Sequence, residues 1–365
     1  MSSPVTRNEG TIKVLVVEDS PVARELLVHI LNSDPQLKVI GTVNNGLEAL
    51  EALKEKNPDV ITMDIHMPEM DGFEATRKIM ETAPIPIVIV TASENPREVG
   101  TSFRAIEAGA LAVVPRPQGL SHPNFKINTT ELLQTVKLMS EVKVVRRWRK
   151  THVTQRPARE REFDVAGQHR DIQVVAIGAS TGGPIALQTI LSGLPRDFPA
   201  PTLIVQHMAP GFTCGFVEWL NQTTRLPVHL ATHGEIMLDG HAYVAPDGFQ
   251  MGVKVAGRIA LSHDAFEHGL RPSVSYLFRS LAEAYGGRSI GVLLTGMGKD
   301  GAAELQAMKE RGAVTFAQDS ESSVVHGMPG EAIKLDAVTY VLPPEKIAAA
   351  LQNLVKSNST SRPGR

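Results

Sequence analysis

Short apolar runs alternate with amphipathic segments along the first part of the chain. Runs such as "IKVLVV", "DVITM" and "IPIVIV" are almost wholly apolar, whereas the segments between them repeat apolar residues every three or four positions. Continuous apolar runs of this length predict strands that are buried on both faces, and the amphipathic spacing predicts helices that cover them. We expect residues 12–145 to form five strand–helix pairs in a doubly wound parallel α/β sheet.

A second series of the same kind begins at Ile172. Its strand candidates are "QVVAIGAS", "PTLIVQHM", "AYVAPDG", "MGVKVAGRIAL", "SIGVLLTGMG", "GAVTFAQD" and "AVTYVLP", with helical patterns between most of them. Residues 172–355 are therefore predicted to form a second doubly wound α/β domain. Residues 146–171 are basic, polar and poor in aliphatic side chains, which favours a solvated linker over an anion-binding patch. Residues 356–365 are predicted to be a disordered tail.

Composition narrows the classes of protein that fit this pattern. A net charge of -2 gives no argument for a nucleic-acid or membrane-surface partner. The single cysteine, Cys214, excludes an internal disulfide and a cysteine-based zinc site, and we expect it to pack in the core. No apolar run approaches the roughly 20 residues of a membrane span, so we expect no membrane insertion and a cytoplasmic protein.

Polar and charged residues stand at the ends of the strands predicted in the first domain. Glu18 and Asp19 end the first strand, Asp64 the third, Thr91 the fourth and Arg116 the fifth. The carboxyl ends of parallel strands meet at one edge of a sheet, so the acids converge, which is costly unless a cation such as Mg²⁺ lies among them. A hydroxyl and a cation beside them suit a phosphoryl group carried on a carboxylate. Any one of these acids alone would be interpreted as a solvated loop residue.

The segments "VLVVEDS", "MDIHMPEMDG", "VTAS" and "VPRP" resemble the receiver domain of two-component response regulators. The resemblance implies a CheY-like (flavodoxin-like) five-stranded fold with Asp64 as the phosphorylation site. It also implies that Mg²⁺ is bound by Glu18, Asp19 and Asp64 together with the main-chain carbonyl of His66. Thr91 is expected to move toward the phosphoryl group.

Two positions depart from the receiver pattern. Receivers usually carry lysine where this chain has Arg116, and they often carry an aromatic residue where it has Val113. Arginine presents a planar fork that needs more room than the compact ammonium of lysine. We therefore expect Asp64 to accept phosphate but the switch at Thr91 and Arg116 to be weakened.

A Gly-rich turn with one serine opens the second domain. "GASTG" fits the pattern G-x-S-x-G, in which Ser180 is either part of a phosphate-binding turn or a nucleophile on a tight bend. The dinucleotide and Walker patterns are absent, which weakens the first alternative. His207 and Asp300 follow two later strands, so they lie at the same edge of the sheet as Ser180. A serine, a base and an orienting carboxylate form a catalytic triad whatever their order in the chain.

The segments "GASTGGP", "VQHMAPGFT", "YVAPDG", "EHGLRPSVSYLFRSLA", "LLTGMGKDGA" and "SSVVHGMPGEA" resemble the CheB family of chemotaxis methylesterases. The resemblance implies that Ser180 is the nucleophile, His207 the general base and acid, and Asp300 the residue that orients His207. It also implies an oxyanion hole formed by the amides of Thr181 and Met297.

This family resemblance implies a phosphorylation-activated hydrolase. Its substrates would be methylated glutamates, and selected glutamines, on the cytoplasmic helices of chemoreceptors, and its phosphodonor a chemotaxis-type histidine kinase. A regulatory docking module without hydrolase activity is one alternative. A receiver fused to an α/β-hydrolase that acts on small soluble esters is another.

Overall fold

The computed structural model describes residues 10–92, 96–119, 122, 125–142, 144, 171–254 and 257–355. The chain divides into two compact units, each built on its own parallel sheet. The predicted linker 146–171 lies outside the described residues except for Asp171, and the predicted tail 356–365 lies wholly outside them.

Five strands and five helices alternate strictly among the described residues of the first unit. Its strands are β1 (Ile12–Val17), β2 (Leu37–Val43), β3 (Val60–Met63), β4 (Ile87–Thr91) and β5 (Ala112–Pro115). Its helices are α1 (Pro21–Asn32), α2 (Gly46–Glu55), α3 (Gly72–Thr82), α4 (Pro96–Ala108) and α5 (Phe125–Ser140). The strand order β2-β1-β3-β4-β5 with all pairs parallel is the flavodoxin-like order, which confirms the predicted fold.

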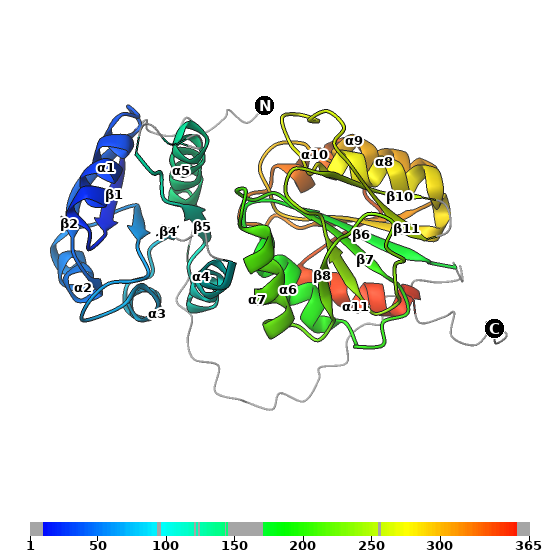
Figure 1. The fold of residues 1–365 in the computed structure, drawn as a ribbon, viewed down its shortest axis with the longest axis horizontal. Coiled ribbons are helices and arrows are strands. Elements are labelled where there is room, and N and C mark those ends of the chain that lie inside the picture. Colours follow the sequence, from blue (N-terminus) through cyan, green and yellow to red (C-terminus); the bar gives the residue numbers. More distant parts are fainter. Residues whose placement is uncertain are drawn as a thin grey trace, which may run out of the picture. The chain divides into compact units, whose positions relative to one another are not determined.

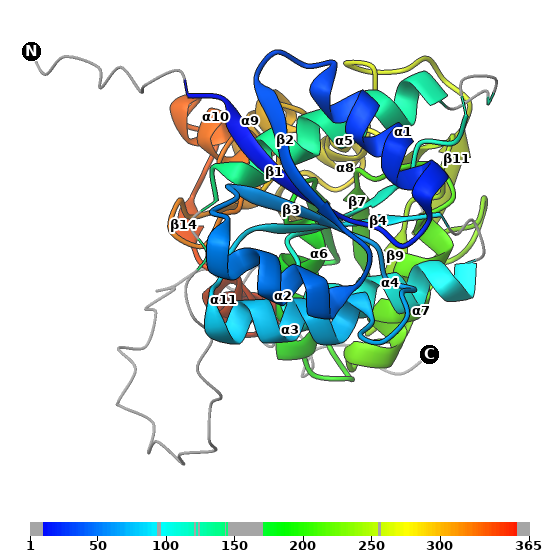
Figure 2. The same ribbon diagram turned by 90° about the vertical axis from the view of Figure 1, so that its left-hand side faces the viewer.

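The two faces of this sheet are covered by different helices. Figure 2 shows α1 and α5 on one face and α2, α3 and α4 on the other. The central strands β3 and β4 are buried at every residue, as continuous apolar runs require. Helix starts follow the local sequence: the side chains of Ser20, Asn45 and Asp71 accept hydrogen bonds from first-turn amides of α1, α2 and α3.

The second unit is larger. Its parallel strands are β6 (Val174–Ala179), β7 (Thr202–Gln206), β8 (Val228–Leu230), β9 (Ala242–Val244), β12 (Ser289–Leu293), β13 (Val314–Gln318) and β14 (Tyr340–Leu342). Its helices are α6 (Gly183–Gly193), α7 (Thr213–Thr223), α8 (Val274–Ala284), α9 (Ala302–Glu310), α10 (Met328–Lys334) and α11 (Pro344–Val355), with a 3-10 turn, η1 (Gly286–Arg288). The sheet order is β14-β13-β12-β6-β7-β9-β8. Helices α6, α7 and α11 cover one face and α8, α9 and α10 the other (Figure 1), so the predicted doubly wound α/β fold is confirmed.

The prediction of a single strand in the run "MGVKVAGRIAL" is wrong. The run "MGVKVAGRIAL" forms an antiparallel hairpin of β10 (Gln250–Lys254) and β11 (Arg258–Ser262), which packs on α8. Gly257 in its turn has φ 72°, a conformation that glycine adopts without strain. Apolar periodicity cannot distinguish one strand from two when the turn between them is this short.

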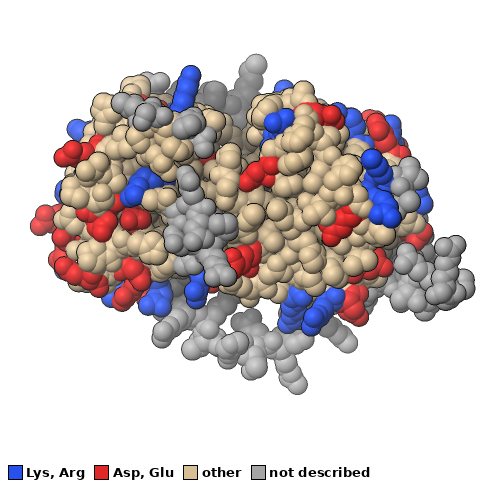
Figure 3. Space-filling view, in the orientation of Figure 1, with Lys and Arg blue, Asp and Glu red and all other residues tan. Residues whose placement is uncertain are grey.

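The surface of the two units is mixed in charge. On the face shown in Figure 3, acidic and basic side chains are interspersed with uncharged ones on each unit. Among the described residues, no helix is both long enough and apolar enough to cross a bilayer. Cys214 is exposed on α7, so the expectation that it packs in the core is wrong.

Candidate functional site

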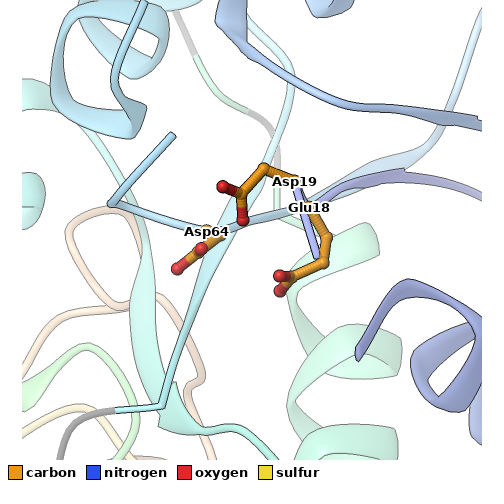
Figure 4. Close-up of side chains that lie close together, drawn as sticks. All are labelled: Glu18, Asp19 and Asp64. Carbon is orange, nitrogen blue, oxygen red and sulfur yellow. The ribbon is translucent and has the colours of Figure 1, made fainter. Parts of the chain in front are cut away.

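An acidic pocket lies at the carboxyl end of the first sheet. Glu18 and Asp19 directly follow β1, and Asp64 directly follows the neighbouring strand β3. The amide of Asp64 donates to the carbonyl of Val17 at 2.9 Å, which brings the two strand ends together. One carboxylate oxygen from each of Glu18, Asp19 and Asp64 lies within 4.8 Å of the other two (Figure 4). The sequence predicted this convergence.

Two of these carboxyl groups are buried. Glu18 is 0% exposed and Asp64 is 8% exposed, whereas Asp19 is exposed. Burial raises the pKa of Glu18, and the charge of Asp64 raises it further. Burial also raises the pKa of Asp64, although the amide of Ile65 donates to its Oδ1 at 2.7 Å. Crowded oxygen ligands of this kind are what Mg²⁺ prefers, so the donor set fits the predicted cation.

The residues predicted to form the phosphoryl switch lie beside this pocket. Thr91 is buried at the end of β4, and its carbonyl accepts a hydrogen bond from the amide of Arg116 at 2.7 Å. One guanidinium nitrogen of Arg116, Nη1, donates to both carboxylate oxygens of Glu18 at 2.9 Å. The positive charge of Arg116 also lowers the pKa of Asp64. The positively charged side chain predicted for this pocket, Arg116, is therefore present, but it is hydrogen-bonded to Glu18, one of the candidate metal ligands. His66 lies in the loop after Asp64 with an exposed side chain.

Ser180 lies in the tight turn between β6 and α6. Its amide donates to the carbonyl of Thr295 at 3.0 Å, and its carbonyl accepts from the side chain of Gln206 at 2.8 Å. The turn needs glycine at Gly182, where φ is 79° and an added Cβ would lie 2.6 Å from Val324. These contacts hold Ser180 at the strand end, as a nucleophile on a sharp bend requires.

His207 and Asp300 form a close pair on the strands that flank β6. His207 directly follows β7, and Asp300 lies in the loop between β12 and α9. Nε2 of His207 is 2.9 Å from Oδ2 of Asp300, with side-chain exposures of 11% and 3%. The amide of His207 also donates to the carbonyl of Ala179 at 2.9 Å, which ties it to the residue before Ser180. Nε2 of His207 is thus engaged with Asp300.

The carboxylate of Asp300 is surrounded by hydrogen-bond donors. It accepts hydrogen bonds from the hydroxyl of Ser273 and from the amides of Val274 and Ser275, at 2.8, 2.6 and 3.1 Å. Burial alone would raise the pKa of Asp300, but the hydrogen bond and charge of His207, with the two serines, lower it to about 2. Asp300 is therefore a stable anion at neutral pH.

The two residues predicted to form the oxyanion hole lie near Ser180 along the chain or through a neighbour. Thr181 follows it in the chain, and the carbonyl of Thr181 accepts from the hydroxyl of Thr295 at 2.9 Å. Gly296 approaches so closely that an added Cβ would lie 2.7 Å from Cβ of Ser180, and Met297 is the next residue. The role of the Thr181 and Met297 amides as oxyanion donors stays a prediction.

The sequence did not predict the part played by Ser273. A serine before the helical run "VSYLFRSLA" is an ordinary N-cap signal, and that signal correctly marks the start of α8. Ser273 and Asp300 are 27 residues apart in the sequence, and no pattern near either residue predicts their hydrogen bond.

Comparisons with known proteins match both parts of the chain. The family model described as CheB methylesterase matches residues 175–351, and the response regulator receiver domain matches residues 14–122. A protein-glutamate methylesterase/protein-glutamine glutaminase of Nitrosospira multiformis is 57% identical over 97% of this chain and 99% of its own. One from Geobacter metallireducens with the same designation is 55% identical, over 94% of this chain and 99% of its own. The CheB methylesterase catalytic domain of Thermotoga maritima, a crystal structure, is 41% identical with a TM-score of 0.49, and the match covers 50% of this chain and 99% of that one.

Proposed function

Because this chain belongs to the CheB family, in which a receiver domain precedes a methylesterase domain, we propose that it is a phosphorylation-activated protein-glutamate methylesterase. It hydrolyses γ-glutamyl methyl esters on chemoreceptors and releases methanol, and it deamidates selected receptor glutamines. The receiver domain spans residues 12–145, the linker 146–171 and the catalytic domain 172–355. The substrates are the cytoplasmic signalling helices of the receptors, which places the enzyme in the cytoplasm.

The observation that carries the proposal is the buried pair of His207 and Asp300 beside Ser180. Ser180 Oγ attacks the ester carbonyl while Nδ1 of His207 takes its proton, because Nε2 is bound to Asp300. The same nitrogen then gives the proton to the departing methoxide, which leaves as methanol. Water attacks the acyl-enzyme by the same route, and Ser180 is restored with a free glutamate as product.

The negative charge that develops on the ester oxygen needs donors that are already in place. The amides of Thr181 and Met297 supply them: Thr181 follows Ser180, and Met297 follows Gly296, which lies against Ser180. The N-terminus of α6 begins directly after this turn, at Gly183 with Pro184 in its first turn, and its positive end faces the same region. A glutamine amide passes through the same intermediate and releases ammonia in place of methanol.

Regulation is assigned to the acidic pocket. Asp64 accepts the phosphoryl group from a chemotaxis-type histidine kinase, and Thr91 and Arg116 respond to it. Glu18, Asp19, Asp64 and the carbonyl of His66 would hold Mg²⁺, and its charge would offset that of the acids and of the phosphoryl oxygens. Phosphorylation relieves a block that the receiver exerts on the esterase, so activity follows the kinase.

The test is methanol release from membranes that contain methylated receptors, with and without a small phosphodonor. We expect release by the wild-type enzyme, stimulation by the phosphodonor, and loss of nearly all release in Ser180→Ala. A Ser180→Ala enzyme with near-wild-type release would refute the nucleophile. Turnover of small soluble esters with no release from receptor membranes would favour the alternative hydrolase, and no hydrolysis of either would favour the docking module.

A further inference from the structure

The buried start of α8 meets the acid of the triad, and we propose that Ser273 is a positioning residue that fixes the Asp300 carboxylate for its action on His207. The inference rests on the proposed esterase function, in which Asp300 orients His207 and stabilises its positive charge. It adds a residue that the triad pattern does not contain. The first turn of α8 thereby becomes a support of the catalytic machinery.

Asp300 accepts a full set of hydrogen bonds. Its Oδ1 accepts from the hydroxyl of Ser273 at 2.8 Å and from the amide of Ser275 at 3.1 Å. Its Oδ2 accepts from the amide of Val274 at 2.6 Å and lies 2.9 Å from Nε2 of His207. A carboxylate held on both oxygens cannot rotate without breaking hydrogen bonds, so the direction of Oδ2 toward His207 is fixed.

Ser273 occupies the N-cap of α8 but does not use its hydroxyl as N-cap serines usually do. Such a serine normally accepts a hydrogen bond from a first-turn amide of its own helix. Here the hydroxyl makes no cap bond within α8 and donates to Asp300 instead. The carboxylate of Asp300 in turn accepts the first-turn amides of Val274 and Ser275. Asp300 is thus the cap of this helix, and the positive end of the helix faces its charge.

The backbone of Ser273 is anchored independently of its hydroxyl. Ser273 is 0% exposed, and its amide donates to Oε1 of Gln250, a side chain that is also 0% exposed. The side-chain nitrogen of Gln250 donates to the carbonyls of Ala265 and Leu270 at 3.1 and 3.2 Å. Removing the hydroxyl therefore leaves the residue in place. Bulk water does not reach the site to replace the lost donor.

Loss of this one donor has two expected consequences for Asp300. Oδ1 then accepts only from the amide of Ser275, so the carboxylate rotates more freely. The orientation of the His207 ring is fixed less precisely as a result. The carboxylate also becomes more basic, because a hydrogen bond to its charged form has been removed. A more basic carboxylate stabilises a positive charge beside it more strongly, so the acidic limb of the pH profile of activity moves to higher pH.

The experiment compares Ser273→Ala with Ser289→Ala in the full chain. Ser289 is an equally buried serine at the start of β12, and its hydroxyl donates to the carbonyl of Gly286 at 2.7 Å. For Ser273→Ala we expect kcat for methanol release to fall about tenfold, equal to about 1.4 kcal/mol. The KM for receptor membranes should stay constant, and the acidic limb of the kcat/KM profile should move up by about half a pH unit. Ser289→Ala should change none of these values.

A conservative variant tests the hydroxyl itself. Ser273→Thr keeps the donor and should restore most of kcat and the wild-type acidic limb. If Ser273→Ala does not fold, Ser273→Cys keeps a side chain of similar shape with only a weak donor and should give the same changes in part. The proposal is overturned if kcat and the acidic limb stay at wild-type values in the folded variant. It is also overturned if Ser289→Ala loses as much activity as Ser273→Ala.

A second measurement does not depend on the esterase reaction. In the full chain labelled with ¹⁵N-histidine, the ring proton of His207 that faces Asp300 should give a low-field proton resonance. We expect that resonance to shift in Ser273→Ala and to stay in place in Ser289→Ala. An unchanged resonance in Ser273→Ala contradicts the positioning role. If wild-type enzyme releases no methanol while the resonance shifts as expected, the proposed function fails and the positioning of Asp300 stands.

Discussion

The acidic pocket of the first unit and the acid of the second unit are both buried, yet their pKa values shift in opposite directions. Glu18 and Asp64 have raised pKa values because burial and neighbouring carboxylates outweigh their donors. Asp300 has a pKa lowered to about 2 because His207, Ser275 and Ser273 outweigh its burial. The difference lies in how completely each carboxylate is supplied with donors. In the proposed function the first site gains its missing positive charge from a bound cation, whereas the Asp300 carboxylate already has its hydrogen-bond donors within the protein.

The strongest test of this contrast is the same substitution in each region. Asp300→Asn places an amide against buried donors, so we expect kcat to fall about ten-thousand-fold. The free energy of unfolding of the second unit should fall by about 1–3 kcal/mol, because buried donors lose their acceptor. Asp64→Asn removes one crowded carboxylate, so the first unit should become more stable without Mg²⁺, and activation by a phosphodonor should be lost. Methanol release measures kcat and the activation by phosphodonor. Urea unfolding, followed by hydrogen exchange in each unit, measures the free energy of unfolding of that unit. A stable Asp300→Asn protein would contradict the capping of α8 by Asp300.

Acid should affect the two units in opposite senses. Glu18 and Asp64 bind protons more readily in the folded state, so lowering the pH toward their ordinary values of 4.5 and 3.8 should stabilise the first unit. Asp300 contributes stability that is present above pH 3.8 and lost as the pH falls to about 2. That contribution is about 2 kcal/mol. Hydrogen exchange across this pH range, without divalent cations, measures the free energy of unfolding of each unit separately. If both units lost stability in parallel as the pH falls, the difference in pKa shift between Asp300 and the acids of the first unit would be contradicted.

Mg²⁺ should offset the repulsion among the carboxylates of the first unit and should stabilise that unit only. At ten times its Kd, Mg²⁺ should raise the free energy of unfolding of that unit by about 1.4 kcal/mol. Chelation by EDTA should remove the effect, and Asp64→Asn should weaken it. The second unit serves as the internal control, since the Asp300 anion is already stabilised by hydrogen-bond donors of the protein. Equal stabilisation of both units would indicate a general salt effect and not binding at the acidic pocket.

The smallest expected effect concerns Arg116, the cation that already occupies part of the pocket. Its bonds to both oxygens of Glu18 hold a candidate metal ligand, so Mg²⁺ and Arg116 compete for the same carboxylate. Arg116→Lys offers a compact charge and should raise both Mg²⁺ affinity and the activation by phosphodonor about threefold. The measurement is esterase rate with and without phosphodonor, with phosphorylation quantified in parallel. Equal activation of both proteins at equal phosphorylation would show that arginine replaces lysine without cost.

Several features were missed or misread because no local signal carries them. The strand β8 has only three residues, too few for a periodic pattern, and Pro227 precedes it. The apolar run over β10 and β11 predicts one strand, because the turn that separates the two strands is short. Cys214 was expected in the core, but it lies on the outer side of α7, and residue type alone does not say which side of a helix faces solvent.

The sequence by itself determined the two doubly wound sheets and the residues at their strand ends. Buried parallel strands must be apolar throughout, and polar residues that follow them necessarily gather at one edge, so Asp64, Ser180, His207 and Asp300 could be found from pattern and resemblance. Only the tertiary structure decided which partners those residues have. Arg116 reaches Glu18 across 98 residues, and Ser273 reaches Asp300 across 27. Such contacts depend on which strands and helices become neighbours. Local periodicity describes one element at a time, so it does not contain them.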